Sequence, residues 1–165
     1  MFKAFTRPES VAMFTRTGVY SEKELAARND VKWDIYTKKV QIESRVMARM
    51  AINHIIPAAL EYKARLLKEV SLHQQVLGSF DGCQTEVELI RRIGSYIEDI
   101  NDRAEAMRLQ RKRANCIEDE YARAVAYHGI AQEIEALRRP IDKLEELVDN
   151  QLWPLPKYRE LLFIS

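Results

Sequence analysis

The chain has 165 residues, with 26 Lys and Arg against 25 Asp and Glu, and its net charge of +1 gives no global electrostatic reason to expect binding to nucleic acid or an anionic membrane. Its composition, 47% hydrophobic and 31% charged with five glycines and five prolines, is typical of long helices and coiled-coil-like bundles. The two cysteines, Cys83 and Cys116, form no C-x-x-C pair, which argues against disulfides and zinc and favours a cytoplasmic protein. Nowhere do 18 uncharged apolar residues run together, so no membrane partner is predicted.

Residues 1–20 are predicted to be a lead-in segment with one short helix. Pro8 suits its first turn and Gly18 suits its C-terminal cap. The segment is rich in aromatic side chains, namely Phe2, Phe5, Phe14 and Tyr20. We expect these side chains to pack either on the rest of the chain or on a partner.

A long helix is predicted over residues 21–77. Ser21 and Glu24 form an S-x-x-E capping box, which marks a helix start. Pro57 lacks an N–H and crowds the preceding turn, so we expect a kink there, and the apolar pattern resumes directly after it. The predicted buried stripe in the first half of this helix consists of Ile35, Ile42, Val46 and Met50.

Residues 78–84 are predicted to form a loop, and a second long helix is predicted over residues 85–128. Thr85 and Glu88 suggest another capping box. The apolar residues of this helix follow a heptad seam, as in a helix that lies antiparallel along a partner: Ile90, Ile93, Ile97, Ile100, Ala104 and Met107. The register of the apolar pattern resets near Gly129, so a third helix is predicted over residues 130–150, with Pro140 disturbing its middle.

Residues 151–165 are predicted to be an extended, proline-rich tail whose apolar side chains need burial. The elements together predict an all-α fold in a single domain covering residues 1–165. We expect a long antiparallel helical hairpin or bundle of three to four helices, with the kinked helix from about Ser21 to Leu77 as its longest element.

No catalytic, cofactor-binding or metal-binding residue is predicted. The three histidines lie outside any E-x-x-H pair, and neither G-x-S-x-G nor G-x-x-x-x-G-K-[ST] occurs. The basic run from Arg108 to Arg113 could attract phosphates. However, acidic residues follow at 118–120 and no stacking aromatics interleave with the run, so no nucleic-acid partner is predicted.

Three stretches of the sequence are more specific than helical pattern. They are Val19–Arg28 (VYSEKELAAR), the segments Ile42–Ala51 and Ile56–Ala59 in the long helix, and Leu152–Phe163 (LWPLPKYRELLF). In this order they resemble the C-terminal region of type III glutamine synthetases. The ending is the most specific part, whereas residues 72–121 match only in helical character.

The resemblance implies a parent enzyme that condenses glutamate and ammonia with the use of ATP and a divalent metal, in a dodecamer built from hexameric rings. Its catalytic residues belong to an upstream domain, and none of their motifs occurs here. ATP and metal are therefore implied for the parent enzyme and not for this chain.

The predicted function is thus structural: packing on the catalytic domain of the same polypeptide and assembly with neighbouring subunits. The candidate interaction surface consists of Phe2, Phe5, Phe14, Tyr20, Trp153, Leu155, Tyr158 and Phe163. The alternative is a free-standing helical adaptor or scaffold with no enzymatic parent, which would explain the same heptads.

Overall fold

The computed structural model describes residues 4–162, except for the side chains of residues 158 and 159. The elements in chain order are α1 (Pro8–Arg16), α2 (Glu22–Met50), the π-helical segment η1 (Ala51–Ile55), α3 (Ile56–Leu77), α4 (Gln84–Asn115), α5 (Glu120–Leu147) and α6 (Tyr158–Leu162). No strand occurs in this described part of the chain. The all-α prediction is confirmed.

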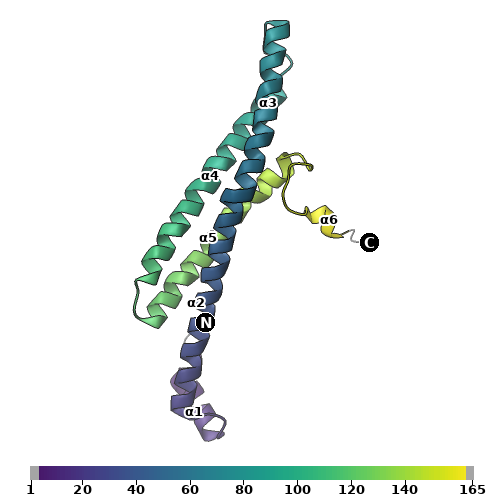
Figure 1. Ribbon diagram of the computed structural model, residues 1–165. Coiled ribbons are helices and arrows are strands. Elements are labelled where there is room, and N and C mark those ends of the chain that lie inside the picture. Colours follow the sequence, from purple (N-terminus) through teal and green to yellow (C-terminus); the bar gives the residue numbers. More distant parts are fainter. Residues whose placement is uncertain (1–3, 163–165) are drawn as a thin grey trace.

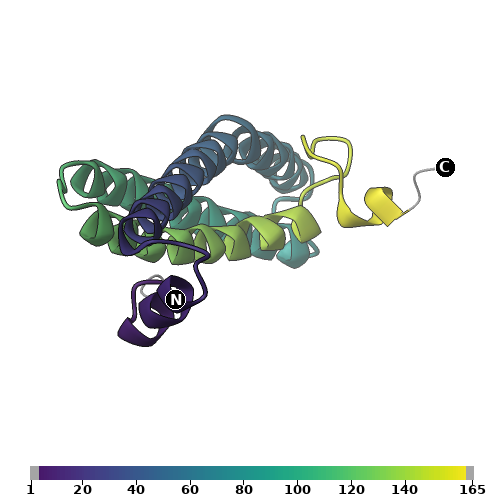
Figure 2. The ribbon, with the colours of Figure 1, turned by 90° about the horizontal axis from the view of Figure 1, so that it is seen from below.

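One rod runs through the molecule, formed by α2, η1 and α3 joined end to end (Figure 1). The chain reverses after α3, so that α4 returns beside α3, and it reverses again so that α5 packs on both α4 and α2. Figure 2 looks along the rod and shows these helices as a bundle, with α1 folded under the start of α2 and the C-terminal segment projecting to one side. The long hairpin predicted from the sequence is the main feature of this architecture.

The capping box predicted at the start of the long helix is confirmed. The backbone N–H of Ser21 donates to the Glu24 carboxylate at 2.9 Å, and the Glu24 N–H donates to the Ser21 hydroxyl at 3.3 Å. The Ser21 N–H and the Ser21 hydroxyl both donate to the Glu24 carboxylate, and these two hydrogen bonds lower the pKa of the Glu24 carboxyl below its ordinary value. The two residues satisfy backbone donors that the first turn leaves unpaired.

Pro57 neither breaks the long helix nor ends it. The π-helical segment η1 ends two residues before it, and the N–H of Ile56 bonds to the carbonyl of Ala51, five residues back. Because Pro57 has no N–H to donate, the preceding backbone must depart from the regular α-helical pattern. The π turn accommodates the proline and lets α2 continue into α3. Pro140 likewise lies inside α5, which runs past it without interruption.

The predicted buried stripe of α2 is wrong. Ile35, Ile42 and Val46 are 60%, 63% and 49% exposed. The buried positions of this helix are instead Leu25, Asn29, Thr37, Val40, Ser44 and Ala48. Small residues bring the helix backbones close to each other, and Ser44, Ala48 and Ala51 lie where the rod crosses the other helices. The bulkier apolar face of α2 consequently points to solvent.

The predicted boundary between the second and third helices is also wrong. The break lies at residues 116–119, not near Gly129, and α5 runs from Glu120 to Leu147 as one helix. The carboxylate of Asp119 accepts from the N–H of Ala122 at 2.6 Å and caps α5. Within α5, Gly129 is exposed and lies between buried Tyr127 and Ile130, whose packing outweighs the cost of a helical glycine, about 1 kcal/mol.

The second predicted capping box does not form. Helix α4 begins at Gln84 with Cys83 as its N-cap, and no side chain caps it, so Thr85 lies inside the helix. The Gln84 side chain accepts instead from the N–H of Gly82 at 3.0 Å. Gly78 ends α3 in the left-handed conformation, φ +72°, which glycine adopts without steric cost. The loop of residues 78–83 therefore has a glycine with positive φ near each end, Gly78 and Gly82.

The core lies where α4 and α5 pack against the middle of the rod. The heptad seam predicted on α4 points into it, with Ile93, Ile100, Ala104 and Met107 buried. From α5 come Tyr127, Ile130, Leu137 and Leu144, each at most 1% exposed. The two ends of the rod extend past this core (Figure 1).

Candidate interaction surface

The outer face of α2 carries an uncovered apolar row, which we call the α2 stripe: Val31, Ile35, Ile42 and Val46. Steps of four, seven and four residues place these side chains on one face of a helix. All four are about half exposed or more. Ion pairs flank the row, from Lys38 to Asp34 at 2.6 Å and from Lys39 to Glu43 at 3.8 Å. An apolar row with charged flanks is the usual pattern of a helix that packs on another protein surface.

The N-terminal aromatic residues form a cluster next to this stripe. The rings of Phe5 and Phe14 stack with centroids 6.4 Å apart, and those of Phe14 and Tyr20 are 5.7 Å apart. Lys32 places its ammonium 3.4 Å from the centre of the Phe5 ring. The cluster borders a cavity of about 770 Å³ that Val31 of the stripe also lines, and Phe5 remains 40% exposed. The aromatic cluster and the α2 stripe are therefore continuous.

The C-terminal candidates are placed differently. Trp153 is only 7% exposed and belongs to the core, and Leu155 is half-buried against it. Lys157 holds this segment in place, because its ammonium donates to the carbonyls of Glu145 and Val148 at 2.6 and 3.1 Å, at the end of α5. The chain itself covers Trp153 and Leu155, which are thus poor candidates for contact with a partner.

The remaining candidates are described in part or not at all. Tyr158 begins the short helix α6, although the placement of its side chain is not described. Phe2 and Phe163 lie outside the described residues. The candidate surface that the structure supports therefore consists of Phe5, Phe14 and Tyr20 from the predicted set, together with the α2 stripe. The sequence pattern had marked three residues of the stripe as apolar and helical, but it assigned them to the core.

Groups with chemical reactivity are dispersed. Within residues 4–162, no three His, Cys, Asp or Glu side chains gather closely enough to hold a metal ion. Burial, together with the carboxylates of Glu86 and Glu69, raises the pKa of the Cys83 thiol, whereas Cys116 is exposed. Among the described residues, no helix is long and apolar enough to cross a membrane.

These features define an all-α domain in which a long helix, backed by two others, presents an uncovered apolar face. The sequence family described as glutamine synthetase C-terminal domain matches residues 1–74. Residues 1–74 match this domain and the chain is similar to glutamine synthetases that include a type-3 enzyme, which confirms the resemblance noted in the sequence.

The similarity to individual proteins extends beyond the family match. The chain is 39% identical to a glutamine synthetase of Bacteroides fragilis (strain YCH46) over 96% of its length. It is 24% identical to a glutamine synthetase of Butyrivibrio fibrisolvens and 21% identical to the type-3 glutamine synthetase of Dictyostelium discoideum, each over 94% of its length. In each case it spans only 22% of the relative.

Proposed function

We propose that this chain is the structural C-terminal part of a type III glutamine synthetase, with no catalytic activity of its own. In the longer enzyme it would pack on the catalytic part of the same polypeptide and help neighbouring subunits to associate in the cytoplasm. ATP, a divalent metal, glutamate and ammonia would be bound by that catalytic part. The resemblance and the 22% coverage of the relatives support this division of roles.

The observation that carries the proposal is the α2 stripe. Ile35 and Ile42 lie two turns apart on one face of α2 and are 60% and 63% exposed, and covering each such side chain would contribute about 1.5–3 kcal/mol. The aromatic cluster extends this surface toward the N-terminus. The occupant we favour is the rest of the polypeptide, since the relatives have more than three quarters of their length outside the matched region.

The experiment compares the longer enzyme with and without residues 1–165 by native mass spectrometry. We expect the assembly to become smaller when the region is removed, and an unchanged assembly would contradict the proposed role. The single variants I35Q and I42Q test the α2 stripe, and V76Q is the control, the same kind of apolar-to-glutamine change at a valine that is 79% exposed near the far end of α3. Only the stripe variants should weaken the assembly.

The absence of catalytic activity is tested separately. The 165-residue chain is incubated with ATP, a divalent metal, glutamate and ammonia, and glutamine formation is followed. We expect no turnover above the protein-free control. Turnover that depends on the chain would show that catalytic residues lie within it.

A further inference from the structure

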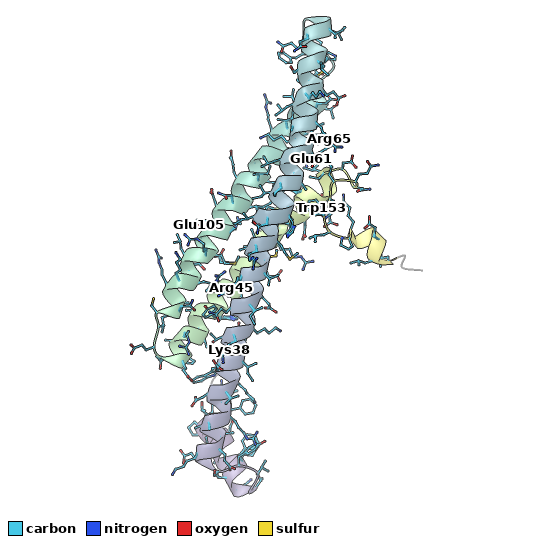
Figure 3. The ribbon with its side chains drawn as sticks, viewed as in Figure 1. Lys38, Arg45, Glu61, Arg65, Glu105 and Trp153 are labelled. Atoms are coloured by element: carbon cyan, nitrogen blue, oxygen red, sulfur yellow. The ribbon has the colours of Figure 1, made fainter. Side chains whose placement is uncertain are left out.

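Four arginines from two helices meet at one pocket. Arg45 and Arg49 lie one turn apart on α2, and Arg108 and Arg111 lie one turn apart on α4. Together they line a pocket of about 190 Å³ whose remaining walls are Ala48, Ile52, Asn53 and Ala104. Figure 3 labels Arg45 on α2 and Glu105 on α4, the two helices that form this pocket. We call these four residues the arginine cluster.

The positive charge of the arginine cluster is largely uncompensated. Arg108 donates from its Nε to the Glu105 carboxylate at 2.6 Å. Among the described residues, no carboxylate forms an ion pair with Arg45, Arg49 or Arg111. Like charges at such close range repel each other, and elsewhere on this bundle arginines such as Arg65 and Arg103 have carboxylate partners.

Arg111 shows the strain of this arrangement most clearly. Its Nε is buried and has no hydrogen-bond partner in the described structure. Burial, with the nearby charge of Arg45, lowers the pKa of its guanidinium. A buried N–H without an acceptor costs about 1–3 kcal/mol, and this unpaired donor belongs to a residue that lines the pocket.

Going beyond the proposed structural role, we propose that the arginine cluster binds a small phosphate-type oxyanion. A guanidinium presents a planar set of N–H donors that matches phosphate oxygens in pairs, and arginines of two helices line the pocket. A multiply charged anion suits four cations better than a single carboxylate does. The site includes Arg108 and Arg111 of the basic run that the sequence singled out, and it adds Arg45 and Arg49 from a helix distant in sequence.

The rival explanation is that the arginine stems only cover apolar surface. Long cationic side chains often lie over alanines and isoleucines while the charged head stays in water. In that case replacing the arginines would alter stability, and anions would have no specific effect. The experiment must therefore measure binding and not stability alone.

The test is a pyrophosphate titration of the 165-residue chain at constant ionic strength, followed by the NMR signals of the arginine Nε–H groups. We expect the Arg111 signal to shift in a saturable way. The exposed changes R45Q and R49Q should each weaken binding about tenfold or more, because each removes a charged donor. R65Q is the matched control, since Arg65 is an exposed arginine of the same rod, paired with Glu61 at 2.9 Å (Figure 3). It should bind like the unaltered chain.

Several results would overturn the proposal. They are the absence of a saturable shift up to about 10 mM pyrophosphate, equal weakening by R65Q, and citrate binding as tightly as pyrophosphate. R111K provides a further variant that keeps the charge and removes the planar donor set, with circular dichroism to verify the fold. Unchanged affinity in R111K would also count against recognition by guanidinium geometry. The oligomeric state plays no part in these measurements, so the outcome is independent of the proposed function.

Discussion

Replacing Gly129 by alanine tests where α5 begins. Gly129 lies inside α5, it is exposed, and a methyl group added there would meet no atom within 4 Å. Alanine is more favourable than glycine in a helix interior by about 0.8–1.0 kcal/mol, chiefly because the unfolded chain loses less freedom. We therefore expect G129A to raise the free energy of unfolding by up to about 1 kcal/mol.

The measurement is urea-induced unfolding followed by circular dichroism. The m-value, which is the slope of the free energy of unfolding against urea concentration, should be the same for all variants. The paired control is G78A, because Gly78 ends α3 at φ +72°, where an L side chain is strained. That variant should be less stable by about 1 kcal/mol or more. If G129A were instead the destabilised variant, a helix boundary at Gly129 would be correct, and the continuous α5 described here would be refuted.

Two further predictions concern the cap of α2 and the cysteines. S21A should lower the free energy of unfolding by about 1 kcal/mol, because Ser21 caps α2. T85A should have little effect, because the Thr85 side chain caps no helix. Equal losses of stability for the two variants in urea unfolding would contradict this difference. Cys116 should react with a thiol reagent at neutral pH much faster than Cys83, because Cys116 is exposed and Cys83 is buried. The raised pKa of the Cys83 thiol also lowers the fraction of it that is present as the reactive thiolate. Rapid labelling that persists in C116S would show that Cys83 is accessible.

The sequence predicted helix boundaries correctly where local hydrogen bonding or glycines specify them. The hydroxyl of Ser21 and the carboxylate of Glu24 satisfy backbone donors within one turn, so a local motif was sufficient to locate the start of α2. The glycines of residues 78–83 likewise marked a turn. The sequence analysis missed the boundary at residues 116–119 because a glycine is a stronger helix-end signal than the N-cap residue Asp119. In the structure, the packing of Tyr127 and Ile130 keeps Gly129 within the helix.

A single sequence does not show which apolar face of α2 is buried. The buried positions of α2 include the small residues Ser44 and Ala48, whereas the larger Ile35, Ile42 and Val46 point outward. A hydrophobicity pattern favours the larger residues as the core, but close crossing of helices favours small ones. Which face is covered depends on the positions of α4 and α5, and these depend on residues far away in the chain.

The sequence alone determined the all-α class, the long helix from Ser21 to Leu77, the heptad seam of α4 and the resemblance to type III glutamine synthetases. These features depend on local hydrogen bonding, on helical periodicity and on motifs read directly from the chain. The tertiary structure alone decided that the α2 stripe is exposed, that Trp153 is covered, and that Arg45 and Arg49 meet Arg108 and Arg111. Each of these depends on how separate helices pack, because burial and the convergence of charges are properties of neighbours in space and not in sequence.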